Sequence, residues 1–152
     1  MPQLQYLTLQ DVLWINTLVT GMPQPFRFLE LEEATFYQYG YGASTELISQ
    51  AGRFLAGFWR LKPFEAGNQA TGFLACLAYL RLNGAAITLR DAEAADWVKQ
   101  VAAEGEHDAE AFRRVVAENE AAPIEGNNLV EIAVQAILEA YPRTVKRLLG
   151  GY

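Results

Sequence analysis

Residues 61–84 read LKPFEAGNQATGFLACLAYLRLNG, and this stretch decides the fold. A Pro–Phe pair and a Gly–Asn turn come first, and an apolar run with the spacing of a helix follows them. The other faces of that run are apolar as well, which is typical of a helix buried on all sides. Asn83 and Gly84 supply a stop. The stretch therefore predicts a tight loop that opens a buried central helix, over about Gln69–Asn83.

Helical signals also dominate the rest of the chain, and strand signals are almost absent. Thr8 with Asp11, and Thr88 with Asp91, resemble capping boxes in which aspartate replaces glutamate. Only residues 86–89 suggest a short extended piece. We predict an all-α domain, with helices over Thr8–Val19, Leu29–Tyr39, Ser44–Leu61, Thr88–Ala102, Asp108–Glu118 and Leu129–Ala140.

The chain has 152 residues, a length that favours one folded domain. Residues 119–128, NEAAPIEGNN, read as a connector. We therefore divide the chain into a helical domain over 1–118 and a C-terminal helical extension over 119–152 that packs on the same domain. The apolar stripe of 129–140 packs on its own domain in this reading; the alternative is a homodimer contact or a groove for a partner.

The charge and the cysteine content exclude several classes of protein. A net charge of −6 argues against a nucleic-acid or anionic-membrane surface, which needs a basic face. No signal peptide and no membrane-spanning run is predicted. The single cysteine, Cys76, falls in the apolar helical pattern and is expected to be buried and unreactive. One cysteine forms no internal disulfide, which fits a reducing compartment and predicts a cytoplasmic protein.

Few side chains outside the loop suggest chemistry. His107, the only histidine, precedes a predicted helix and is expected at the surface. No Cys/His cluster suggests zinc. The tryptophans are expected in or near the core: Trp14, Trp59 and Trp97. Three tyrosines gather at a predicted loop, where exposed rings would indicate a binding surface: Tyr37, Tyr39 and Tyr41.

Four segments together resemble a known family. They are LTLQDVLWIN (7–16), LELEEATFY (29–37), the stretch 61–84, and ITLRDAEAADWVKQVAAEGEHDAEAF (87–112). In order and spacing they resemble the Doc (death-on-curing) branch of the Fic/Doc fold, over about Leu7–Val116. The resemblance implies a compact helical domain whose central loop holds the phosphates of a nucleotide at a helix N-terminus, where backbone N–H groups and the helix dipole attract anions.

Active members of the family carry a motif of the form HPFxDGNKRTA or HxFx(D/E)GNxRxxR. Pro63, Phe64, Gly67, Asn68 and Thr71 of this chain match the Doc version. The positions that carry the working groups do not match. Lys62 stands at the histidine, Ala66 at the metal-binding acid, Gln69 at the Lys or Gly, Ala70 at the first arginine and Phe73 at the second arginine.

The resemblance implies a transfer of phosphate or nucleotide monophosphate to a protein hydroxyl. In the family the histidine removes the hydroxyl proton, the acid holds magnesium and the cations stabilise charge on the phosphates. A lysine ammonium is protonated at neutral pH and accepts no proton. We expect Lys62 to be solvated or to attract phosphate as a point charge. Glu65, one residue from the acid position, points elsewhere, so no metal site is predicted.

The loop residues also have structural reasons to persist. We expect the amide of Asn68 to bond the turn and to cap the following helix, and Gly67 to supply a positive φ or a close backbone approach. If an anion binds weakly at this helix start, the candidate phosphate-binding residues are Lys62, Gly67, Asn68, Gln69 and Thr71.

Two functions follow from the sequence. The first is a catalytically degenerate Doc-like domain that binds or regulates a protein, either a separate partner of the toxin–antitoxin kind or a second copy. The second is a divergent transferase that uses ATP or another nucleotide with Mg²⁺. Some Fic relatives are restrained by a helix bearing [S/T]xxxE[G/N]. Residues 121–126, AAPIEG, keep the Glu–Gly pair and lack the hydroxyl residue.

Overall fold

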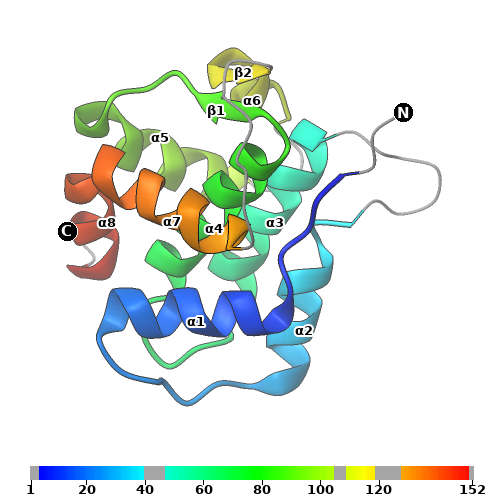
Figure 1. The fold of residues 1–152 in the computed structure, drawn as a ribbon, viewed down its shortest axis with the longest axis vertical. Helices are drawn as coiled ribbons and strands as arrows, with labels where there is room; N and C mark the ends of the chain where they lie inside the picture. The colour runs from blue at the N-terminus through cyan, green and yellow to red at the C-terminus, as the bar shows by residue number, and fades with distance from the viewer. Residues whose placement is uncertain (1–3, 40–46, 105–108, 119–127, 151–152) are drawn as a thin grey trace.

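A computed structural model of the chain describes residues 4–39, 47–104, 109–118 and 128–150 (Figure 1). Helices make up most of this part, and one two-stranded sheet accompanies them. The predicted all-α class is confirmed. The elements, in chain order, are α1 (Leu9–Thr20), α2 (Phe28–Phe36), α3 (Leu47–Leu61), α4 (Asn68–Leu82), β1 (Ala85–Ile87), α5 (Asp91–Glu104), α6 (Ala109–Val115), β2 (Val116–Glu118), α7 (Leu129–Ala140) and α8 (Pro142–Gly150).

α4 is the centre of the fold (Figure 1). All eleven residues from Ala70 to Leu80 are buried, because α1, α3, α7 and α8 all pack on this helix. Burying one Leu or Phe side chain contributes roughly 1.5–3 kcal/mol. A helix that is apolar on every face is therefore stable only where neighbours cover it on every side. The central buried helix predicted from residues 61–84 is confirmed.

The local signals at the first helix are confirmed. Thr8 accepts the N–H of Asp11 (3.1 Å), the Asp11 carboxylate accepts the N–H of Thr8 (2.8 Å), and Gly21 ends the helix with φ of 85°. These bonds satisfy N–H groups that a helix start leaves without partners.

The second helix is shorter than predicted. α2 ends at Phe36, whereas the sequence suggested Tyr39. Gln38 lies two residues past this end, and its buried side chain bonds both backbone groups of Leu7. The Leu7 N–H donates to Gln38 Oε1 and Gln38 Nε2 donates to the Leu7 carbonyl, each at 2.7 Å. A long-range bond of this kind has no signature in a local pattern.

Two local predictions around the sheet are wrong. The helix expected to run to Glu118 ends at Val115, and residues 116–118 form β2, antiparallel to β1. Thr88 does not cap α5. Its N–H instead extends the sheet to the Val115 carbonyl at 2.6 Å, and Glu93 Oε1 accepts the N–H of Arg90 at the helix start (3.3 Å). The sheet pairs residues that are 29 or more positions apart in the sequence, and this pairing overrode the local capping pattern.

The C-terminal helices both lie against the centre of the fold. α7 packs on α4, and α8 contacts α1, α4, α5 and α7. Pro142 starts α8 at the position where a missing N–H costs nothing. Within the described residues, no helix combines the length and the apolar character that crossing a bilayer requires. The caps predicted at Ser44 and Asp108, together with His107 and residues 121–126, lie outside the described residues.

Candidate functional site

The loop between α3 and α4 begins with an unusual backbone conformation. α3 ends at Leu61, and Lys62 takes a positive φ of 46°, which is uncommon for a residue with a side chain. Pro63 and Phe64 follow and are buried. The chain therefore reverses direction at Lys62 and reaches the start of α4 at Gly67, with the Lys62 side chain exposed to solvent.

Asn68 closes the loop on itself. Its Oδ1 accepts the N–H of Phe64 (2.8 Å) and its Nδ2 donates to the Phe64 carbonyl (2.7 Å). The predicted bond of this amide to the turn is confirmed. The predicted cap is wrong, because α4 begins at Asn68 itself and the cap position is held by Gly67, which has no side chain.

Gly67 meets both conditions expected of it. Its φ is 79°, in the left-handed region. A Cβ built there would lie 2.5 Å from Thr20 Cγ2 and 3.2 Å from Asn16 Nδ2. The loop therefore passes so close to α1 that only glycine fits, whether or not a ligand is bound.

Asn16 of α1 anchors the loop, a role that was not predicted from the sequence. Its buried Nδ2 donates to the Ala66 carbonyl (2.9 Å) and to Thr71 Oγ1 (3.1 Å). One signal was available, since Asn16 follows Val12 and Ile15 on the buried side of α1. A polar residue in an apolar stripe needs a buried partner. The same bond removes Thr71 from the candidate phosphate-binding set, because its side chain is buried and faces Asn16.

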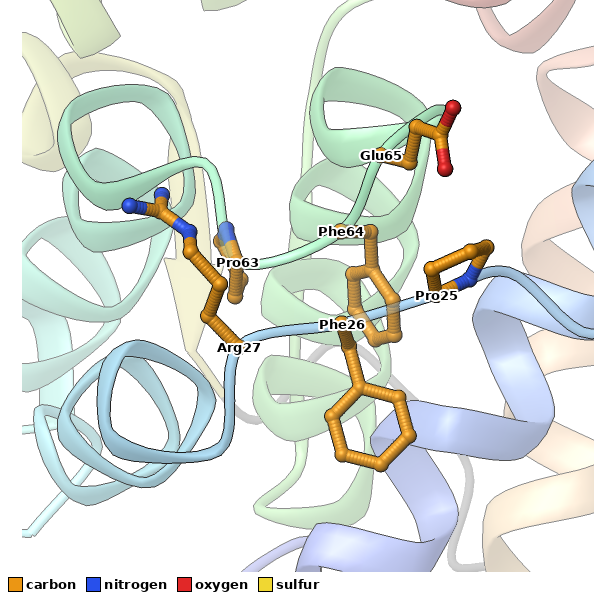
Figure 2. A pocket seen from close by; sticks show the side chains of 6 residues that line it. All are labelled: Pro25, Phe26, Arg27, Pro63, Phe64 and Glu65. Atoms are coloured by element: carbon orange, nitrogen blue, oxygen red, sulfur yellow. The ribbon is translucent and has the colours of Figure 1, made fainter.

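The extended segment before α2 supports the loop from its other side (Figure 2). Phe26 forms an antiparallel bridge with Phe64, in which the Arg27 N–H donates to the Pro63 carbonyl (2.8 Å) and the Glu65 N–H to the Pro25 carbonyl (3.0 Å). The Arg27 guanidinium bonds the carbonyls of Leu61 and Lys62. The Arg27 guanidinium thus stabilises the backbone of the loop.

The end of the C-terminal helix lies beside the start of α4. A pocket of about 260 Å³ is lined by Lys62 and by four of the loop residues that follow it, and α8 contributes Leu148, Leu149 and Gly150. Gln69 also lines this pocket, and its Oε1 is buried without a hydrogen-bond partner among the described residues. Four of the five candidate phosphate-binding residues therefore share one pocket: Lys62, Gly67, Asn68 and Gln69.

The electrostatic field of this pocket is weak for a phosphate site. The N-terminus of α4 is favourable to an anion. Lys62 is the only cation among the residues that line the pocket, and the Glu65 carboxylate opposes it. Ala66 is exposed and carries no ligand atom, and Ala70 and Phe73 are both 0% exposed. Among the described residues, no group of three His, Cys, Asp or Glu side chains is placed to hold a metal ion.

Asp91 of α5 holds α8 in its place beside the loop. Its carboxylate accepts the N–H groups of Arg143 (3.0 Å) and Thr144 (2.9 Å) and the hydroxyl of Thr144 (2.8 Å). Partial burial acts to raise the pKa of Asp91, but these bonds and the charge of Arg143 outweigh it and lower that pKa below its ordinary value. The carboxylate thus acts as an N-cap supplied by another helix.

We expect Asp91→Ala to lower the free energy of unfolding by about 1–2 kcal/mol at pH 7, because it removes this cap. A lowered pKa means that the folded state binds fewer protons. The contribution is therefore complete above the unfolded pKa of about 3.9 and is lost as the pH falls through the folded value. Urea unfolding of both proteins between pH 7 and pH 3 tests this. Asp96→Ala, at a side chain 79% exposed, is the control and should cost less than about 0.5 kcal/mol.

The cysteine, the tyrosines and the tryptophans considered in the sequence have structural roles where they are described. Cys76 is fully buried, its thiol donates to the Ala51 carbonyl (3.4 Å), and burial raises its pKa; the expected burial is confirmed. Tyr37 bonds Glu33 (2.6 Å) and lies under the Arg60 guanidinium. Tyr39 contacts the ring of Tyr6, with centroids 4.3 Å apart. Tyr41 lies outside the described residues, and the three tryptophans pack at the edge of the core, as expected.

Comparison with known proteins places this loop in a family. Residues 6–80 match the sequence profile of the Fic/DOC family, a span from just before α1 to near the end of α4. It includes every loop contact from Asn16 to Thr71 described above. The match stops short of the Val116 to which the sequence resemblance extended. No curated protein and no solved structure gave a significant match. Over residues 6–80, which hold α1 to α3, the loop and nearly all of α4, the chain matches the Fic/DOC family.

Proposed function

We propose that this chain is a Fic/Doc domain that has lost transfer chemistry and binds or regulates a protein. The observation that carries the proposal is the contrast between the loop's backbone and its side chains. Gly67, Asn68 and Asn16 preserve the turn through specific contacts. At the positions of the base, the acid and the first arginine stand an exposed lysine and two alanines, Lys62, Ala66 and Ala70.

Without the base, the metal-binding acid and the arginine, the chain lacks too much of the catalytic machinery to transfer a phosphate or nucleotide group in the ordinary way. General base catalysis contributes about 10²–10⁴-fold, and a cation that stabilises a phosphoryl transition state contributes about 10³–10⁵-fold. Groups that act as a unit are not additive, yet base, metal ligand and arginine are all replaced. The arginine position is held by Ala70, which is uncharged and fully buried, so this position supplies no cation to the pocket.

The pocket itself is small for a nucleotide. At about 260 Å³ it falls below the range of about 300–1,000 Å³ that is usual for small-molecule sites. The end of α8 occupies one side of it. The retained turn is therefore better explained by the needs of the fold than by a bound ligand.

The surface supports a protein partner. Nine large apolar side chains are exposed in the described residues, and seven of them fall between residues 18 and 39. Exposed apolar side chains that gather in one region are typical of interaction sites. They lie on α1, on the segment between α1 and α2, on α2 and just after α2: Leu18, Met22, Phe26, Phe28, Leu29, Phe36 and Tyr39.

The outward face of α2 carries two of these apolar side chains beside the exposed Glu33. Leu29 is 72% exposed, and Phe36, seven residues on, lies on the same side of the helix. A helix of a monomer ordinarily turns charged residues to solvent. The similarity to the Doc branch favours a toxin–antitoxin setting, in which the partner of such a domain is a protein.

Calorimetry with ATP and MgCl₂ tests the proposal against the transferase alternative. We expect no heat of ATP binding that depends on Mg²⁺, and no dissociation constant for ATP below about 1 mM. The reason is that the residues lining the pocket supply a single cation and no set of metal ligands. An active Fic/Doc enzyme with the full motif serves as the positive control. Micromolar ATP binding that depends on Mg²⁺ would overturn the proposal and favour the enzyme.

A further inference from the structure

A second hollow lies away from the family loop, between α1 and α7. Both helices pack on α4, and Figure 1 shows α7 above α1 on the same side of the molecule. The hollow between them has a volume of about 540 Å³. We call it the α1/α7 groove, and its lining residues are Trp14, Asn128, Glu131, Ile132, Gln135, Ala136 and Glu139.

The floor of the groove is apolar and open to solvent. Trp14 is half-buried, and Ile132 is 44% exposed although a large apolar residue ordinarily turns inward on such a helix. Ala136, four residues after Ile132, extends the floor along the same side of α7. Leu18, four residues after Trp14, is also exposed and continues the apolar side of α1 toward the region of residues 18–39.

The walls of the groove carry charge of one sign. Neither α1 nor α7 contains a lysine or an arginine. Glu131 and Glu139 both line the groove, and neither forms an ion pair within the described part of the chain. They are eight residues apart on one helix, which separates their Cα atoms by about 12 Å along its axis. An apolar floor between two uncompensated carboxylates is complementary to an apolar residue flanked by cations.

We propose that the α1/α7 groove binds a cationic amphipathic helix of a partner protein. The partner helix lies between α1 and α7, as helices pack into grooves between helices. Its apolar residues cover Trp14 and Ile132. Lysines or arginines seven or eight residues apart on its sequence reach Glu131 and Glu139, because that spacing spans about 10–12 Å.

A binding measurement with a defined peptide tests the groove. The probe is a labelled 18-residue helix of leucine on one face and lysine on the other, and the control peptide replaces each lysine with glutamate. Fluorescence anisotropy at 50 and 300 mM NaCl should show binding of the lysine peptide alone, weaker at the higher salt because the charges are then more screened. Absence of binding at 1 mM peptide would overturn the proposal.

Matched variants separate the groove from the overall negative charge. Glu131→Gln with Glu139→Gln changes the net charge from −6 to −4, and Glu32→Gln with Glu65→Gln makes the same change elsewhere. We expect the groove pair to weaken binding at least tenfold and the control pair less than twofold. If both pairs of substitutions weaken peptide binding equally, binding depends on the net charge of the protein and not on the groove, and the proposal would fail.

The apolar floor is tested separately. Ile132→Ser should weaken binding of the lysine peptide at least fivefold. Leu149→Ser, at a side chain 41% exposed on α8, should not weaken it. Both are surface substitutions and should leave the fold intact. Sedimentation velocity of the free chain completes the test. A dimer that Ile132→Ser dissociates would show that the occupant is a second copy, and would overturn the proposal.

The inference rests on the proposed function only in taking the partner to be a protein. The two can fail separately. Mg²⁺-dependent ATP binding would refute the loss of transfer chemistry and would say nothing about the groove. Peptide binding that the groove substitutions do not weaken would refute the groove proposal and would say nothing about transfer chemistry.

Discussion

Asn16→Leu is expected to lower the free energy of unfolding by about 3 kcal/mol, because it leaves the buried Thr71 Oγ1 and the part-buried Ala66 carbonyl without their donor, and each such loss costs about 1–3 kcal/mol. Leucine has the same branched arrangement of side-chain heavy atoms as asparagine but is larger, so the change removes the bonds to the Ala66 carbonyl and Thr71 Oγ1 and adds some overpacking. Urea denaturation followed by circular dichroism measures the effect. The result would show that the family loop is held by α1 in the absence of any ligand.

A double-mutant cycle with Thr71→Val isolates the bond. If Asn16 and Thr71 interact as the 3.1 Å distance indicates, the double variant should lose at least about 0.5 kcal/mol less than the sum of the single losses. Strictly additive losses would show that the two side chains do not depend on one another. Thr17→Ala, which removes a hydroxyl bonded only to the Leu13 carbonyl of its own helix, is the control and should change little.

Gly72→Ala is expected to lower the free energy of unfolding by about 2 kcal/mol, although alanine favours a helix by about 1 kcal/mol over glycine. A Cβ at Gly72 would lie 2.7 Å from Phe58 Cβ and 3.0 Å from Phe58 Cγ, closer than such atoms approach. These are the first atoms of the Phe58 side chain, so α3 and α4 would have to separate. Thermal and urea unfolding both measure the loss.

Gly52→Ala is the matched control for this prediction. It is the same substitution in a helix interior, yet a Cβ there meets only Phe112, at 3.5 Å, an ordinary contact. Without a clash the propensity gain remains, and we expect the free energy of unfolding to stay the same or to rise by up to about 1 kcal/mol. If both alanine variants stabilise the protein, the close packing of α3 on α4 is wrong.

Parts of the fold that depend on neighbours in the chain were predictable. The capping box of Thr8 and Asp11, the stop at Gly21 and the buried run of α4 all follow from residues within one or two helical turns. The loop's Gly67 was predictable too, since a glycine before a helix is expected to have a positive φ or a close contact.

The rest depends on residues far apart in the sequence. The short strand after α6 exists because it pairs with residues 85–87 across the chain, and the same pairing takes Thr88 away from the start of α5. Asn16 lies 50 residues from the carbonyl that it anchors. Asp91, on another helix, caps α8, the helix whose end lies beside the loop. None of these partners is visible in a local pattern of residues.

The most direct test of the account is transfer itself. Purified chain, MgCl₂ and ATP labelled at the α or the γ phosphate are incubated with extract proteins as acceptors, beside a Fic/Doc enzyme that keeps the full motif. The account predicts no labelled protein above the level of a reaction without the chain, because Lys62, Ala66 and Ala70 supply neither proton acceptor, metal ligand nor guanidinium. Label on a protein that appears with the chain and disappears with Lys62→Ala would contradict it.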